Sequence, residues 1–552
     1  MSGICDILTT QTHRAFAEAG FDLPPEQCNV TPSDRPDLCD FQCNASFAAA
    51  KLYKRKPLDI ASEVAERLEN CTVAAPGFLN INVSNDLLTE RLNAMAQDRR
   101  LGFPSVEAKT IVLDYGGPNV AKALHVGHLR SAVIGDALYK IAGFLGYRVI
   151  SDIHLGDWGF PMGLVLAALQ ERGFKAGDEL APQTLNTIYP EAAARAKTDE
   201  VFQAEAKRIT VELQQGNAEY FKIWKQIQSL SVADAKANYD ALNVRDFDYW
   251  YGESDAQRYV PRTLEIFERR GLIRDDNGTK LVDIKLDSDK EPMPPVIVVK
   301  ADGGEVYATT DLATILQRVE DWKPDACVYL TDNRQTLHFK QVFRAAKLAG
   351  IAPPDIDFTH IGFGTVNGAD GKPYKTRDGG VMSLSTLIAD VRAVLPDERV
   401  ACAAIRIGEL QNQPLKDYRF DVEKFCASEG KTGPYLQYTA VRIASVLAKA
   451  DAPDAPNATI NAPASDVERG LMLALERAGI SLLKAWADKA PSAICDCLFD
   501  ICARFNSFYA AQHILTCEDA TQKASWLALL QLTREVIVTL LGVLGVDVPE
   551  NM

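Results

Sequence analysis

Residues 110–151 show the clearest succession of structural patterns in the chain. The run 110–115 is short and rich in β-branched residues, which is typical of a buried strand. A loop of Gly and Pro follows, and apolar residues then recur at helical spacing from about residue 128 to residue 145. Gly146 is placed to cap this helix, and residues 147–151 have the pattern of the next strand. Strand, crossover helix and strand form the βαβ unit of a parallel nucleotide-binding sheet.

Further strand-like runs extend this unit into one α/β domain over residues 109–424. The runs are 295–300, 306–309, 327–330 and 359–363. A mostly helical stretch, roughly residues 163–243, separates the first unit from these strands and is expected to be an insertion into the sheet. The expected fold class is therefore α/β, with a Rossmann-type parallel-sheet catalytic domain.

The two ends of the chain have different patterns. Residues 1–108 mix helical spacing at 40–51 and 60–68 with a strand-like alternation at 78–83, which predicts a small α+β module. After about residue 425 the strand signals stop. Helical spacing then predicts an all-helical bundle over 425–552, with helices at 433–449, 465–489, 494–512 and 525–545 and a loop at 450–465.

Composition agrees with several domains in a globular chain. The chain has 552 residues, whereas one core usually stops growing at roughly 250–300 residues. With 47% hydrophobic and 24% charged residues, wholesale disorder is excluded. The net charge of −15 argues against a surface that coats nucleic acid broadly, but it allows local basic patches. The 12 cysteines include no Cys-x-x-Cys pair, so structural thiols are favoured over disulfides or zinc.

The sequence gives no sign of export or membrane insertion. The N-terminus has neither a basic start nor an apolar core, so a signal peptide is not expected. The apolar run 536–546 is too short to cross a bilayer. A cytoplasmic protein without a membrane partner is expected.

The loop between the first strand and its helix carries the candidate chemistry. It contains Asn119, Lys122, His125, Gly127 and His128. The two histidines are three residues apart at a helix start, so both can face one ligand, and free N–H groups there suit a triphosphate. Gly127 lets a flat ligand such as adenine approach the backbone. Histidines that only pack the helix, or that bind zinc, are the alternatives, although no third zinc ligand stands out.

At His125-Val126-Gly127-His128 the chain resembles the class I aminoacyl-tRNA synthetases, whose first signature is His-Ile-Gly-His. Further motifs resemble the arginyl-tRNA synthetases in particular and occur in the family's order along essentially the whole chain. They are residues 118–122, 129–131, 134–136, 156–159, Tyr307 with Asp311, Arg334-Gln335 with His338, 433–438, and 508–515. The resemblance implies an N-terminal tRNA-binding module, a catalytic domain and a helical anticodon-binding domain.

This resemblance implies a ligase that activates L-arginine with ATP and transfers it to the terminal adenosine of tRNA(Arg). The implied catalytic residues are His125, His128 and Lys122, with Lys375 and Arg377 on a loop that closes over pyrophosphate. The second class I signature, Lys-Met-Ser-Lys-Ser, is absent, and Lys375-Thr376-Arg377 stands in its place. Lys122 is then expected to supply the missing charge. Mg²⁺ is expected to arrive with ATP, and no protein-bound metal is expected.

A guanidinium is a planar cation, so its pocket needs carboxylates and flat acceptors. Asp311 is the leading candidate, and helix capping is its alternative role. The residues implied for arginine are Asp114, Gly117, Pro118, Asn119, His128, Tyr307, Asp311 and Gln335. Those implied for ATP are His125, Gly127, His128 and His338.

The expected partners are tRNA(Arg), L-arginine and ATP, and neither DNA nor a membrane. Lys431, Tyr435 and Arg442 are candidate tRNA-binding residues in the helical bundle. Other functions stay open at this point. They are a class I synthetase for another amino acid, a tRNA-independent nucleotidyltransferase and a non-catalytic tRNA-binding relative.

Overall fold

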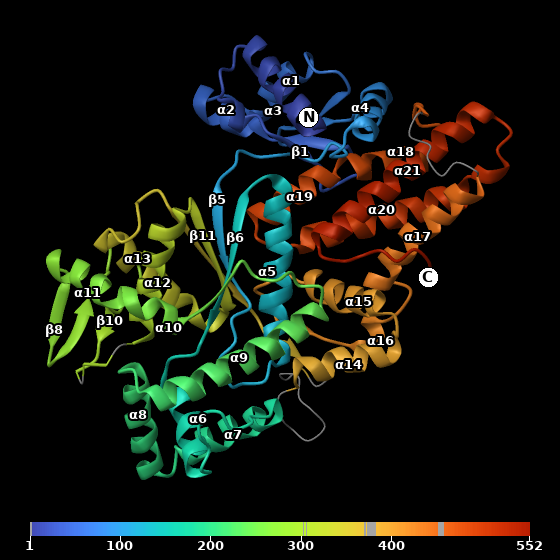
Figure 1. Ribbon diagram of the computed structural model, residues 1–552. Coiled ribbons are helices and arrows are strands. Elements are labelled where there is room, and N and C mark those ends of the chain that lie inside the picture. The colour runs from blue at the N-terminus through green and yellow to red at the C-terminus, as the bar shows by residue number, and fades with distance from the viewer. Residues whose placement is uncertain (1–2, 302, 305, 369–370, 372–381, 451–457) are drawn as a thin grey trace.

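The computed structural model describes residues 3–301, 303–304, 306–368, 371, 382–450 and 458–552 (Figure 1). A central parallel sheet lies between an N-terminal module, a helical insertion and a C-terminal helix bundle. The expected α/β fold class with its two flanking modules is confirmed. The boundaries at residues 108 and 424 stay predictions.

The central sheet has the strand order β12-β11-β5-β6-β7, and each neighbouring pair is parallel. Helices flank this sheet, so the middle of β5 is buried and its sequence is an apolar run. Because the strands are parallel, their carboxyl ends meet at one edge, where open α/β sheets bind ligands. The strands are β5 (Thr110–Asp114), β6 (Arg148–Leu155), β7 (Tyr249–Gly252), β11 (Ala326–Asp332) and β12 (Asp357–Phe363).

Helix α5 (Val126–Leu145) is the crossover that joins β5 to β6, as expected. It begins two residues before the predicted start, because His125 caps it through its side chain. It ends at Gly146, which has a φ of 109° in the left-handed region that glycine tolerates. The helix stands beside the strands in Figure 1, with its first turn at the carboxyl ends of the sheet.

Two predictions about the second half of the sheet domain are wrong. Residues 306–309 are no strand: Val306 precedes α12 (Tyr307–Trp322), whose early Thr309 and Thr310 gave the segment a β-branched pattern. Thr309 instead donates its hydroxyl to the backbone of Val298, which fixes the helix start. Strand β10 (Val296–Val299) exists but joins a separate antiparallel sheet with β9 (Thr279–Val282) and β8 (Ile273–Asp276).

The expected helical insertion lies between β6 and β7. The order along the chain is α6 (Phe160–Glu171), α7 (Pro182–Arg195), α8 (Glu200–Gln214) and α9 (Ala218–Asp240). Helices α10 (Glu253–Ala256) and α11 (Val260–Arg269) follow β7 and lead to the antiparallel sheet. After the sheet strands come α13 (Thr336–Ala349), α14 (Leu384–Val394), α15 (Glu398–Leu410) and α16 (Val422–Phe425), with short strands β13 (Val366–Asn367) and β14 (Tyr418–Arg419).

The N-terminal module is a small antiparallel sheet of order β1-β2-β4-β3 with helices against it. The strand predicted at 78–83 is confirmed as β4 (Phe78–Ile81). The helix predicted from residue 40 is wrong at its start, because Phe41–Cys43 form strand β2 and α2 (Ala45–Tyr53) begins after it. The remaining elements are α1 (Ile4–Glu18), β1 (Val30–Pro32), α3 (Pro57–Ala65), β3 (Cys71–Ala74) and α4 (Asn85–Gln97).

The C-terminal bundle packs against both α5 and the N-terminal module (Figure 1). Its helices are α17 (Gly433–Lys449), α18 (Asp466–Glu476), α19 (Ala478–Ala487), α20 (Ser492–Ala511) and α21 (Ala520–Val543). The helix expected over 465–489 is interrupted at Arg477, whose guanidinium donates to the backbone of Asp40 in the N-terminal module. Arg469 also pairs with the Asp40 carboxylate at 2.6 Å, so the two ends of the chain are joined.

Helix α21 corrects one expectation about apolar length. The apolar segment extends beyond residues 536–546, because the whole helix has 24 residues and a window of mean hydropathy 1.5. By length and composition such a helix could cross a membrane, but 67% of that window is buried inside the protein. The helix therefore has the setting of a core helix in the bundle.

Candidate active site

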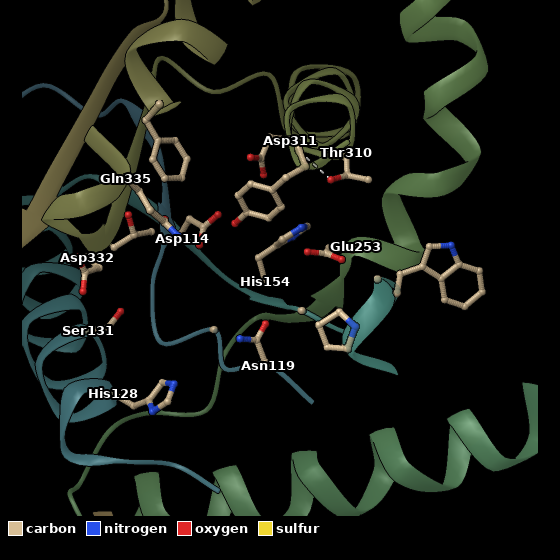
Figure 2. Close-up of a pocket in the computed structure, with 18 of the residues that line it drawn as sticks. Asp114, Asn119, His128, Ser131, His154, Glu253, Thr310, Asp311, Asp332 and Gln335 are labelled. Atoms are coloured by element: carbon tan, nitrogen blue, oxygen red, sulfur yellow. Dashed lines mark hydrogen bonds between the residues drawn. The ribbon is translucent and has the colours of Figure 1, made fainter. Parts of the chain in front are cut away.

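A cavity of about 620 Å³ lies at the carboxyl ends of β5, β6 and β11, between the start of α5 and helix α12. Nine of the residues that the sequence analysis assigned to substrates line it together: Asp114, Gly117, Asn119, His125, Gly127, His128, Tyr307, Asp311 and Gln335. Figure 2 shows Asp311, His154 and Glu253 grouped on one side and His128 on the other. The cavity therefore has an acidic end and an imidazole end.

The two histidines form the imidazole end. The backbone N–H of Gly127 donates to His125 Nδ1 at 3.0 Å, and the backbone N–H of His125 donates to His128 Nδ1 at 3.1 Å. Burial lowers the pKa of His128 to about 3, and desolvation also lowers the pKa of His125. Because each Nδ1 accepts a bond, each neutral ring carries its proton on Nε2 and presents a neutral donor.

The backbone before α5 is held close to β6. The peptide N–H of Gly156 donates to Pro118 O at 3.1 Å, and that of Val120 donates to Gly156 O at 3.0 Å. A Cβ on Gly117 would lie only 2.1 Å from the backbone oxygen of His154, so no larger residue fits there. This close approach places the Asn119 side chain at the cavity wall.

Asp311 is the centre of the acidic end. It lies inside α12, one turn after Tyr307, and the cap of that helix is Val306, so the capping role is wrong. Its carboxylate Oδ2 lies 2.5 Å from His338 Nε2, and the His338 ring lies 4.9 Å from the ring of Tyr307. The Asp311 carboxylate raises the pKa of Tyr307, so that hydroxyl stays protonated and available as a donor.

The cavity residues that were not predicted from the sequence include Glu253 and His154. Glu253 begins α10, directly after β7, and desolvation raises its pKa to about 7, with Asp157 and Asp311 adding to the rise. His154 lies in β6, and neither ring nitrogen has a hydrogen-bond partner among the described residues. Their place at the carboxyl ends of strands was the available signal, but the aromatic strand 249–252 was not recognised.

Asp114 and Gln335 complete the acidic end. The Asp114 carboxylate accepts from Arg318 through Oδ2 at 2.6 Å and also faces the cavity. The side-chain oxygen of Gln335 is buried and has no hydrogen-bond partner in the part of the chain that the structure describes. Two acceptors are thus available to a ligand that brings N–H donors.

Several predicted site residues do not line the cavity itself. Pro118, Lys122 and His338 do not appear among the residues that line the cavity. The Lys122 ammonium lies 4.4 Å from the centre of the Tyr189 ring, near enough to both histidines to lower their pKa. Lys375 and Arg377 lie outside the described residues.

Of the candidate tRNA-binding residues, Tyr435 and Arg442 lie on α17 and Lys431 lies just before it, and none of them lines the cavity. Asn506 donates to the hydroxyl of Tyr435 at 2.9 Å and accepts from Arg442 at 3.3 Å. Lys431 pairs with Asp496 at 3.3 Å, and both side chains are exposed. Tyr438 of α17 is 47% exposed, whereas Tyr435 and Arg442 are half-buried, and the role of these residues in tRNA binding stays a prediction.

The described residues contain no cluster of three or more His, Cys, Asp or Glu side chains that could hold a metal ion. In the same part of the chain all twelve cysteines are free thiols, most of them buried.

Three family models match successive parts of the chain. Residues 91–422 match the family described as tRNA synthetases class I (R), catalytic domain. Residues 436–552 match a DALR anticodon binding domain, and residues 6–83 match the arginyl tRNA synthetase N terminal domain. The chain belongs to the arginyl-tRNA synthetases. The resemblance noted in the sequence is thereby confirmed.

Similar arginyl-tRNA synthetases match the chain over its full length. The arginine–tRNA ligase of Alkaliphilus oremlandii is 42% identical over 97% of each chain, and that of Agathobacter rectalis is 41% identical over 100% of each. Among solved structures, the Thermus thermophilus arginyl-tRNA synthetase aligns with a TM-score of 0.80 at 22% identity, covering 100% of each chain. The Plasmodium falciparum enzyme aligns with a TM-score of 0.84 at 20% identity over the same coverage.

Proposed function

We propose that this arginyl-tRNA synthetase joins L-arginine to ATP, forming arginyl-adenylate, and then transfers the arginyl group to the 3′-terminal adenosine of tRNA(Arg). The observation that carries the proposal is a single cavity with carboxylates at one end and neutral imidazole donors at a helix start. The cationic side chain of arginine fits the acidic end, and a phosphate chain fits the imidazole end.

The acidic end accepts the arginine side chain. Asp311, oriented by His338, and Glu253 supply carboxylates for the planar guanidinium, and Tyr307 closes the wall. Asp114 and Gln335 provide acceptors for the α-ammonium group, with Asn119 near the carboxylate. A shorter or uncharged side chain would leave these buried groups unpaired, which is strongly discriminating.

The imidazole end receives ATP. One carboxylate oxygen of arginine attacks the α-phosphorus, the bond to pyrophosphate breaks, and the adenylate forms. His125 and His128 donate to the phosphate oxygens as charge builds up, aided by the N–H groups of α5. Lys122, Lys375 and Arg377 are proposed to add positive charge near pyrophosphate, and Mg²⁺ is proposed to enter bound to ATP.

In the second step a ribose hydroxyl of the terminal adenosine, the 2′-hydroxyl in this class, attacks the arginyl carbonyl and AMP leaves. Lys431, Tyr435 and Arg442, with the exposed ring of Tyr438, are proposed to meet the tRNA on the bundle. A basic and aromatic face there reconciles tRNA binding with a net charge of −15. We propose that the enzyme works in the cytoplasm, where its tRNA substrate is charged for translation.

Aminoacylation of total tRNA with each amino acid in turn tests this function. Of the amino acids, only arginine should be esterified. Pyrophosphate exchange should require tRNA, whereas a tRNA-independent nucleotidyltransferase would catalyse exchange without it. Asp311→Asn should raise the KM for arginine roughly 10- to 150-fold, because it removes a charge-assisted bond, while the KM for ATP stays unchanged. Esterification of another amino acid, or an unchanged KM in Asp311→Asn, would contradict the proposal.

A further inference from the structure

A buried arginine lies directly beneath the acidic end of the cavity. Arg318 of α12 donates from Nη2 to Asp114 Oδ2 at 2.6 Å and to Asp152 Oδ2 at 2.7 Å, and from Nε to Asp152 Oδ2 at 3.0 Å. Its side chain is 1% exposed, and so is that of Asp152, whereas Asp114 is 14% exposed. One guanidinium thus bridges a fully buried carboxylate and one that reaches the cavity.

The sheet register brings these groups together. Asp114 at the end of β5 lies opposite Asp152 of β6 on one side and Tyr329 of β11 on the other. The Arg318 guanidinium lies 5.0 Å from the centre of the Tyr329 ring. Arg318 therefore packs on a row of residues across three parallel strands, which leaves the guanidinium little freedom to move.

The charges in this group do not cancel. One guanidinium faces two carboxylates, which leaves one negative charge in excess. Asp152 pairs with Arg318 out of contact with water, whereas Asp114 opens to the cavity. Arg318 bonds to Asp114 through Oδ2, and among the described residues Oδ1 has no hydrogen-bond partner. The excess negative charge can therefore interact with a cationic ligand through Oδ1 of Asp114.

We propose that Arg318 is a positioning residue, which holds the Asp114 carboxylate so that its free oxygen receives the α-ammonium group of the amino acid. The inference rests on the proposed function, because it needs arginine in this cavity. Arg318 never touches the substrate in this scheme. It acts by bridging the two carboxylates: Nε and Nη2 bond to the buried Asp152, and Nη2 also bonds to Asp114. A planar guanidinium can make this set of bonds in fixed directions, whereas a single ammonium cannot.

A competing role is purely architectural. Tyr307, Asp311 and Arg318 lie along α12 at spacings of four and seven residues, so they share one face of the helix. Arg318 could then act by anchoring α12 and, through it, Asp311. That role would affect every ligand that carries a guanidinium, whereas the proposed role affects only ligands that also carry an ammonium group.

Three ligands separate the two roles. L-Arginine carries all its groups, agmatine lacks the carboxylate but keeps both cations, and 5-guanidinopentanoate lacks only the α-ammonium group. In the full-length enzyme with tRNA(Arg), Arg318→Lys keeps the charge but loses the fork. In this variant we expect the KM for arginine and the inhibition constant of agmatine to rise about 10-fold or more. The inhibition constant of 5-guanidinopentanoate should change less than about 2-fold.

Other variants keep the test decisive if Arg318→Lys folds poorly. Asp152→Asn leaves Arg318 and removes the excess charge, so it should weaken binding of the same two ligands selectively. Adding Asp114→Asn to Arg318→Lys should cost little more than either change alone, because both remove one interaction. The matched control is Arg406→Lys, which alters a fully buried arginine paired with Asp136 at 2.6 Å outside the cavity. In this control the ratios among the arginine KM and the two inhibition constants should not change.

Equal weakening of all three ligands would assign Arg318 the architectural role, and no weakening of any would remove it from substrate binding. Both results overturn the inference without touching the proposed function. Failure of the unaltered enzyme to esterify arginine would overturn the proposed function instead.

Discussion

Glu253 is a cavity residue whose charge changes near neutral pH. Its pKa is raised to about 7, chiefly by desolvation, whereas the pKa of His128 is lowered to about 3. In the empty site Glu253 is therefore partly protonated at pH 7, and only its ionised form can pair with a guanidinium. Arginine binding should then favour the ionised form of Glu253, so a proton is released when arginine binds.

This residue predicts a pH dependence of substrate affinity. The KM for arginine should fall as pH rises from about 6 to about 8, because Glu253 ionises through about 7. Glu253→Gln should raise the KM at pH 8 and flatten that slope, measured by aminoacylation at saturating ATP and tRNA. A slope that persists unchanged in the Gln variant would contradict the assignment.

The sign for stability is the opposite. A carboxyl group whose pKa is raised in the folded state keeps its proton longer than in the unfolded chain. The contribution of Glu253 to the free energy of unfolding is thus fully present below its ordinary value of 4.5 and is lost as pH rises to about 7. Binding free energy from the guanidinium compensates for this loss when the site is filled.

The sequence predicted those site residues that lie close together in the chain. Asn119, His125 and His128 belong to one loop and helix start, so local spacing sufficed. His154 and Glu253 are brought to the same cavity only by the order of strands β6 and β7, which local patterns do not encode. The lowered pKa of the histidines likewise depends on burial, which the fold alone reveals.

At the scale of elements, the first turn of α5 is built around a glycine. A Cβ on Gly127 would lie 2.8 Å from His125 Cε1 and 2.9 Å from its Nδ1, closer than side chains pack. His125 would have to swing away and lose the bond from the Gly127 peptide. The absence of a side chain is therefore a condition for the imidazole donor.

Gly127→Ala should lower the rate of tRNA-dependent pyrophosphate exchange by on the order of 10²–10³, comparable to the loss of one oxyanion donor. The melting temperature should hold, since alanine favours helices. Gly143→Ala in the same helix is the matched control, because nothing lies within 4 Å of the added Cβ. Full activity in Gly127→Ala would show that the His125 position is not critical.

Element types were predicted best where length and capping agreed. Helix α5 and its Gly146 cap were predicted from the sequence, and so were strands β5 and β6. The error at 306–309 arose because Val306, Thr309 and Thr310 favour a strand locally, while the packing of α12 on the sheet imposes a helix. The separate sheet with β10 was missed because pairing partners are not encoded in one strand.

At the scale of the whole molecule, Arg406 of α15 joins distant parts of the chain. It is fully buried and donates to Asp136 of α5, to the backbone of Leu242 after the insertion and to the backbone of Leu544 after α21. Lys140 pairs with the same Asp136. The active-site helix, the insertion and the bundle thus meet at one guanidinium.

Arg406→Met should lower the free energy of unfolding by about 3 kcal/mol, because it leaves the buried Asp136 carboxylate with Lys140 as its one remaining charged partner among the described residues. Urea unfolding of the full-length protein measures this. Arg504→Met removes the exposed pair with Asp500 and should cost less than about 1 kcal/mol. Equal costs for the two variants would mean that Arg406 is not a structural junction.

The junction of Asp40 with Arg469 and Arg477 gives the molecule a closed outline. The backbone N–H of Ile4 also donates to Glu476, so the first helix is tied to the last quarter of the chain. Deleting the N-terminal module would leave Arg469 and Arg477 without Asp40 and would expose the surface of the bundle that the module covers. The N-terminal module is thus an integral part of the folded enzyme, and a displacement at one end of the chain is transmitted to the other.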